Sequence, residues 1–162
     1  MVQGGKDGLV RLLNRQNLSG SGRPGQVGGE LQALPSAGCA TFTQPLVMVD
    51  QSGMPGVILA GTCAMAAYRV AIGAQGQPAL QLVWKLPLQT TTPVLAGGVM
   101  LAASSGALLA LDPASGQQLW SSSMASAGGT IGAIHWESPI VINGRVYCSD
   151  EDGMLSAYTL PG

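Results

Sequence analysis

The stretch TPVLAGGVMLAASSGALLALDPASGQQLW, residues 92–120, decides the fold. Its apolar runs are about five residues long, and each ends at residues typical of turns. A Gly-Gly pair follows the first run, and Gly106 follows the second, because glycine tolerates the positive φ of a tight turn. A third turn begins at Asp112 and ends at Gly116. The pattern predicts four short antiparallel strands joined by tight turns.

Parts of this stretch return along the chain. Three prolines that suit the start of a strand, Pro45, Pro93 and Pro139, are 48 and 46 residues apart (93 − 45 and 139 − 93). Trp84 stands in the place of Trp120. We expect one domain, 1–162, with units at about 2–35, 43–86, 92–121 and 137–160. The first unit lacks its first strand, and the last unit lacks its fourth.

Four-stranded units at this period indicate a β-propeller. The predicted fold class is all-β: a partial β-propeller of four-stranded antiparallel blades, two complete and two incomplete. Hydrophobic residues make up 46% of the chain and charged residues 9%. This composition is typical of sheets buried on both faces, and it excludes a disordered chain.

Several classes of protein are excluded by composition. No apolar run approaches the roughly 18 residues of a membrane-spanning helix. The net charge of −1 provides no electrostatic surface for nucleic acid. Residues 1–6 read as turn residues, so we expect no signal peptide there.

The cysteines Cys39, Cys63 and Cys148 form no CxxC pair, which disfavours zinc. Two interpretations remain open. In the first, all three cysteines are buried free thiols. In the second, Cys39 and Cys63, which flank one predicted hairpin, form a disulfide, and Cys148 is left unpaired.

The repeat resembles that of the pyrroloquinoline-quinone (PQQ)-type β-propeller proteins. That family repeats a Pro strand, a Gly hairpin, an Asp-Gly turn, an Ala-Leu-Asp ending, a Ser-Gly turn and a Trp. The residues in register are Gly106, Asp112, Gly116 and Trp120 in the opening stretch, with Trp84 and Gly153 in neighbouring units. The resemblance implies the fold. Its members include quinoprotein dehydrogenases and outer-membrane assembly lipoproteins, so it does not define one function.

The enzymatic members of that family carry an adjacent cysteine pair and a calcium ion beside the quinone. This chain contains no Cys-Cys pair. We therefore expect no catalytic residues, no metal site and no cofactor, and PQQ with calcium is implied only by the resemblance.

The most unusual stretch is His135, Trp136 and Glu137, directly before an expected inner strand. It contains the only histidine of the chain. In a propeller this position lies near the central channel, so the three residues are candidates for a ligand-binding site. The alternative is a packed tryptophan with solvated neighbours. For Trp84 and Trp120 we expect packing between blades.

The leading hypothesis for function is a non-enzymatic interaction or scaffold module that binds a protein or an envelope component. One alternative is a fragment of a PQQ-dependent dehydrogenase whose catalytic residues lie in missing blades. Another is a sensor propeller for a glycan or small ligand. Expected partners are a protein or the remaining propeller blades, with self-association as a third option. The resemblance implies a periplasmic or extracellular location.

Overall fold

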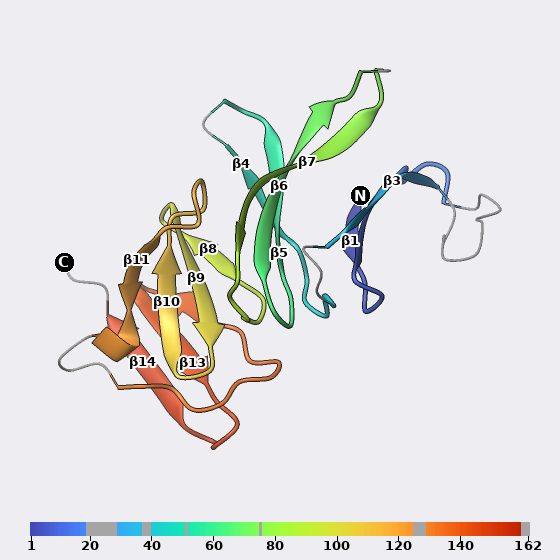
Figure 1. Cartoon of the computed structure of the whole chain (residues 1–162). Coiled ribbons are helices and arrows are strands. Elements are labelled where there is room, and N and C mark those ends of the chain that lie inside the picture. Colours follow the sequence, from blue (N-terminus) through green and yellow to red (C-terminus); the bar gives the residue numbers. More distant parts are fainter. Residues whose placement is uncertain (19–28, 37–39, 51, 75, 125–128, 160–162) are drawn as a thin grey trace.

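The computed structural model describes the chain except residues 19–28, 37–39, 51, 75, 125–128 and 160–162. Its strands form four antiparallel sheets, here called blades 1 to 4, that follow one another along the chain (Figure 1). Blade 1 contains β1 (Val2–Gly4), β2 (Leu9–Leu13) and β3 (Glu30–Pro35). Blade 2 contains β4 (Leu46–Val49), β5 (Pro55–Ala60), β6 (Met65–Ile72) and β7 (Pro78–Leu86). Blade 3 contains β8 (Val94–Ala96), β9 (Val99–Ser104), β10 (Ala107–Leu111) and β11 (Gln118–Ser121). Blade 4 contains β12 (Ile140–Ile142), β13 (Arg145–Ser149) and β14 (Leu155–Thr159).

The prediction of an all-β chain with two four-stranded and two three-stranded units is confirmed. A short 3-10 helix, Ser122–Met124, follows β11. None of the described segments is a helix that is long and apolar enough to cross a membrane.

The turns close where the glycines were expected to close them. Gly106, Gly116 and Gly153 have φ angles of 92°, 75° and 79°. A side chain added at Gly106 or Gly153 would meet nothing within 4 Å, so backbone conformation alone favours glycine there. At Gly116 the neighbouring blade also approaches the backbone.

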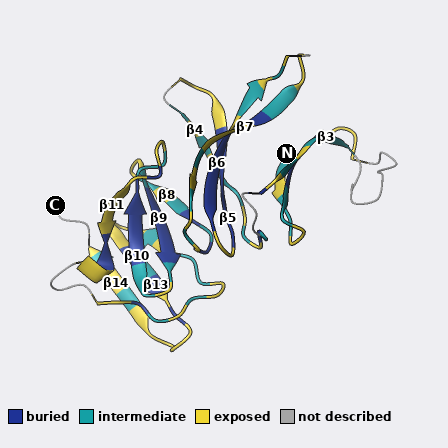
Figure 2. Cartoon of the chain, in the orientation of Figure 1, coloured by how far each residue is buried: buried dark blue, intermediate teal, exposed yellow. Residues whose placement is uncertain are grey.

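The blades pack face to face, and apolar clusters of buried side chains hold them together. Between blades 1 and 2 the cluster is built around Val10, Leu12, Val57, Leu59 and Tyr68. Between blades 2 and 3 it contains Ile58, Met65, Met100, Leu109 and Leu111. Between blades 3 and 4 it contains Leu101, Leu108, Ala110 and Val146. Since each middle strand packs on both sides, the centres of β5, β9 and β10 are buried throughout (Figure 2).

In each of the first three blades, a bulge interrupts the pairing between the last two strands. The pairing shifts between Leu12 and Leu13, between Ala67 and Tyr68, and between Ala110 and Leu111. In each case one residue of the outer strand is skipped: Leu31, Val83 and Leu119. These three side chains are 41%, 51% and 56% exposed. The bulge accounts for their exposure, because the extra residue is left out of the ladder.

Candidate functional site

The candidate site is a pocket of about 260 Å³ at one end of the molecule. It is formed where the loops before the inner strands of blades 2, 3 and 4 meet two turns from blades 1 and 2. Its lining residues are Lys6, Phe42, Thr43, Gly61, Thr62, Gln89, Thr90, Thr91, Ile134, His135 and Trp136. The structure therefore brings His135 and Trp136 to a pocket shared by four blades.

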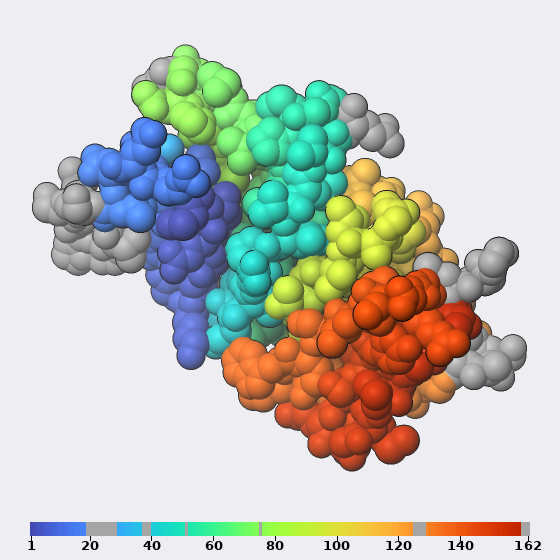
Figure 3. All heavy atoms as spheres, turned by 180° about the vertical axis from the view of Figure 1, so that it is seen from behind, coloured from blue at the N-terminus to red at the C-terminus, as the bar shows by residue number. Residues whose placement is uncertain are grey.

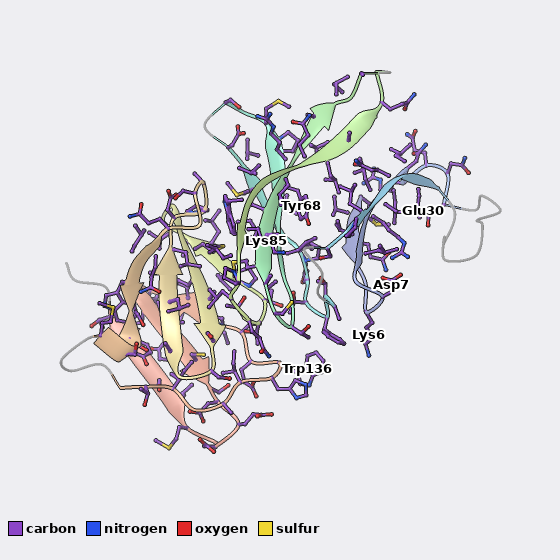
Figure 4. The ribbon with its side chains drawn as sticks, viewed as in Figure 1. Lys6, Asp7, Glu30, Tyr68, Lys85 and Trp136 are labelled. Carbon is purple, nitrogen blue, oxygen red and sulfur yellow. The ribbon has the colours of Figure 1, made fainter. Side chains whose placement is uncertain are left out.

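One wall of the pocket is a row of four side chains. The Lys6 ammonium lies 5.1 Å from the centre of the Phe42 ring. The Phe42 and Trp136 rings meet edge to face with centres 5.9 Å apart, and His135 stacks on Trp136 at 4.3 Å. Figure 4 shows Lys6 and Trp136 at the same end of the molecule. The row connects the β1–β2 turn of blade 1 to the loop before blade 4.

Glu137 has a different position from its two neighbours. Its carboxylate accepts hydrogen bonds from the backbone N–H groups of His135, at 2.6 Å, and Trp136, at 3.0 Å. The His135 N–H is the first cause that lowers the pKa of the Glu137 carboxyl. Glu137 is absent from the residues that line the pocket and holds the loop that presents the other two. His135 Nδ1 lies 3.6 Å from Glu151, and both side chains are exposed.

Four threonines (Thr43, Thr62, Thr90 and Thr91) and a glutamine supply neutral polar groups. The Thr43 hydroxyl donates to the carbonyl of Ala60 at 2.9 Å, and the Thr91 hydroxyl donates to the carbonyl of Glu137. Thr90 is 4% exposed, and its hydroxyl has no hydrogen-bond partner among the described residues. The exposed Gln89 lies beside it on the pocket lining.

Lys6, Phe42 and Thr90 were missed from sequence. Phe42 and Thr90 each stand three residues before a proline that marks an inner strand, Pro45 and Pro93, and this position is a signal that could have found them. No such signal exists for Lys6, because its approach to Phe42 depends on how two blades are placed.

The two repeated tryptophans lie between blades. Trp84 in β7 donates its indole N–H to the carbonyl of Pro113 in blade 3 at 3.0 Å, and its ring lies against Gly116. Trp120 in β11 meets Tyr158 of blade 4 edge to face, with ring centres 5.7 Å apart. Gln32 in β3 holds the equivalent place in blade 1.

Asp112 forms the turn that receives Trp84. Its carboxylate accepts hydrogen bonds from the Ala114 N–H at 3.0 Å and the Ser115 hydroxyl at 2.6 Å. The Ser115 hydroxyl is the first cause that lowers the pKa of this carboxyl. Asp112 therefore shapes a turn and does not line the pocket.

Cys63 is disulfide-bonded, so the interpretation of all three cysteines as free thiols is wrong for this residue. Cys39, on which the alternative pairing depends, lies outside the described residues. Cys148 is a buried free thiol. Within the described part of the chain, no group of three or more His, Cys, Asp and Glu side chains could hold a metal ion.

Residues 70–160, more than half of the chain, match the family model described as outer membrane protein assembly factor BamB. The structure is similar to that of the computationally designed protein Ika4, with 13% sequence identity and a TM-score of 0.55 over 99% of this chain and 84% of that one. The structure of BamB from Moraxella catarrhalis gives 15% identity and a TM-score of 0.39 over 98% of this chain. The chain spans 57% of that protein's length. No curated protein matches this sequence. The match over residues 70–160 shows that the chain belongs to the PQQ-like β-propeller family described as outer membrane protein assembly factor BamB.

Proposed function

We propose that the protein is a non-enzymatic interaction module of the cell envelope and that it binds its partner through one exposed face of blade 4. The description of its family as an outer membrane assembly factor supports an envelope location. The proposed binding needs no cofactor.

The observation that carries this proposal is the exposure of apolar side chains on one face of blade 4, here called the open face. The register of β12, β13 and β14 puts Ile140, Ile142, Arg145, Tyr147 and Leu155 on this face. Ile140, Ile142 and Leu155 are 64%, 55% and 68% exposed. The opposite face, with Val146, packs on blade 3. Figure 3 shows blade 4, in orange and red, at the surface. Clustered exposed apolar side chains mark interaction surfaces.

The molecule itself indicates what kind of surface fits the open face. All three blade contacts are made by one antiparallel sheet packed face to face on another. The open face offers Ile and Leu side chains of the same kind, so another antiparallel sheet is the partner that it fits. A second copy of this chain can supply such a sheet, and so can further blades of a longer propeller.

The test is the mass of the protein in solution, measured by size exclusion with light scattering. We expect a mass above the 16.4 kDa of one chain, because the open face of one copy covers that of another. Ile142→Glu places a charge in this face and should return the mass to that of a monomer.

Leu119→Glu is the matched control. Leu119 is exposed to a similar degree, at 56%, but it is a bulge residue outside the open face. It should leave the mass of the assembly unchanged. A monomeric wild-type protein would refute a second copy as the occupant of the open face, and an equal effect of both variants would refute the assignment of binding to that face.

A further inference from the structure

The pocket contains a polar group that the protein leaves unsatisfied. Thr90 is 4% exposed and lines the pocket, and its Oγ1 atom has no hydrogen-bond partner in the described part of the chain. A buried hydroxyl without a partner costs stability, and natural structures mostly avoid it. Because Oγ1 is closed off from solvent in the ligand-free protein, a ligand hydroxyl reaches it only when the Thr90 side chain turns toward the pocket. The threonine hydroxyl can then both donate and accept, and the bond removes this cost.

The pocket also exposes aromatic surface. Phe42 is 40% exposed and Trp136 is 60% exposed, although each ring already contacts a neighbour in the row. The exposed rings, together with the threonine side chains and Gln89 of the lining, suit a ligand that has an apolar face and hydroxyl groups at its edge. A six-membered sugar ring has both. At about 260 Å³ the pocket suits a group of that size better than a larger molecule.

The described lining of the pocket contains one cation, the Lys6 ammonium, and neither aspartate nor glutamate. The carboxylates around the pocket are engaged elsewhere: Asp7, which follows Lys6 in the chain, pairs with Arg11. Glu137 accepts from two backbone N–H groups, and Glu151 lies 3.6 Å from His135. A ligand carboxylate beside Lys6 would therefore meet a cation without a competing anion in the lining.

We propose that this pocket binds an acidic sugar, a hexuronate residue of a glycan. The sugar ring stacks on Phe42 and Trp136, its carboxylate pairs with the Lys6 ammonium, and a ring hydroxyl bonds Thr90 Oγ1. This goes beyond the interaction through the open face, since the pocket and the open face share no residue. Either function can fail without the other.

The experiment is a titration of the ¹⁵N-labelled protein with glucuronate, followed on the indole N–H signals of its three tryptophans. The Trp136 signal is assigned from the spectrum of Trp136→Phe. We expect glucuronate to shift the Trp136 signal in the millimolar range, while the Trp84 and Trp120 signals stay in place. Glucose, which lacks the carboxylate, and acetate, which lacks the ring, should each bind about tenfold more weakly or worse.

Two variants separate the roles. Thr90→Val keeps the shape and the fold, and should weaken glucuronate binding about fivefold to tenfold, whereas Thr159→Val on exposed β14 should not change it. Lys6→Gln should abolish the preference for glucuronate over glucose, with Arg15→Gln as its control.

Each other outcome overturns the proposal. No shift of Trp136 removes the site. Equal binding of acetate removes the recognition of the ring, and equal binding of glucose removes the recognition of the carboxylate. Unchanged affinity in Thr90→Val shows that the buried hydroxyl does not contact the ligand.

Discussion

Gly116 and Trp84 meet at the contact between blades 2 and 3. This contact determines how much the free energy of unfolding falls when a single methyl group is added at residue 116. Gly116 has a φ of 75°, and a Cβ atom added there would lie 3.0 Å from Cε3 of Trp84 and 3.1 Å from Cδ1 of Leu86. Gly116→Ala therefore combines two costs. A left-handed backbone costs a residue with a side chain about 1–2 kcal/mol, and overpacking costs about 1–3 kcal/mol. The free energy of unfolding should fall by about 2–5 kcal/mol in total.

The two costs are separated by repeating the substitution in Trp84→Leu. This change alone destabilises the protein, because it removes buried ring surface and the hydrogen bond to Pro113. It also removes the ring that the new methyl group would strike. Gly116→Ala should then cost about 1 kcal/mol less than in the wild type, because the backbone cost and the approach to Leu86 remain while the ring is gone, and this difference is the coupling between residues 84 and 116.

Gly106→Ala is the matched control for this cycle. Gly106 has a φ of 92°, and nothing lies within 4 Å of an added Cβ. Its cost of about 1–2 kcal/mol should be the same in both backgrounds, because only the backbone conformation opposes the substitution.

The assay is urea unfolding followed by circular dichroism, with the variants compared at equal m-values. A cost of Gly116→Ala that is the same in the wild type and in Trp84→Leu would refute the contact between the ring and this turn. A Gly106→Ala cost that depends on residue 84 would show that the cycle reports something other than this contact.

Three further outcomes are expected. Gln32→Ala removes two hydrogen bonds to Leu80 in blade 2, from the Leu80 N–H at 2.6 Å and to its carbonyl at 3.5 Å, and should lower the unfolding free energy by about 1 kcal/mol in urea. The backbone N–H of Gly132 is the first cause that lowers the pKa of Asp150. The stability from Asp150 is therefore full above the unfolded-state value of about 3.9 and is lost as pH falls through the folded value. In Asp150→Asn the fall in melting temperature below about pH 4 should be shallower; equal slopes would contradict this. Burial raises the pKa of the Cys148 thiol, so iodoacetamide should label it only after denaturation, and rapid labelling of the native protein would contradict its burial.

The turns and strands could be predicted from sequence because their signals are local. Glycines at 106, 116 and 153 fix the turns through their own backbone conformation, and a fixed turn sets the register of the strands that it joins. The position of Trp84 and Trp120 at equivalent places in the repeat was enough to expect packing between blades. The row from Lys6 to His135 could not be predicted, because it depends on the relative placement of three loops from distant parts of the chain.

The outer strands show a second limit of sequence reasoning. In a regular strand, residues two apart lie on the same face, so Leu82 and Trp84 would point to the same neighbour. The skipped residue Val83 changes this: Leu82 pairs with Tyr68 in the ladder, and Trp84 pairs with Ala67. Tyr68 faces blade 1 and Ala67 faces blade 3. One strand can therefore pack its first half against one blade and its tryptophan against the next.

The same argument explains Gln32, which carries no tryptophan signal in the sequence. It follows the skipped Leu31, pairs with Leu12 and reaches Leu80 of blade 2. The residue after each bulge thus contacts the following blade. Gln32 of blade 1 does so through a hydrogen bond, and Trp84 of blade 2 through a hydrogen bond and ring packing. Trp120 of blade 3 does so through ring packing with Tyr158. What repeats in this propeller is the bulge and the direction that it gives to the next side chain. The chemical identity of that side chain can change, because a bulge fixes orientation and leaves several side chains able to meet the neighbouring sheet.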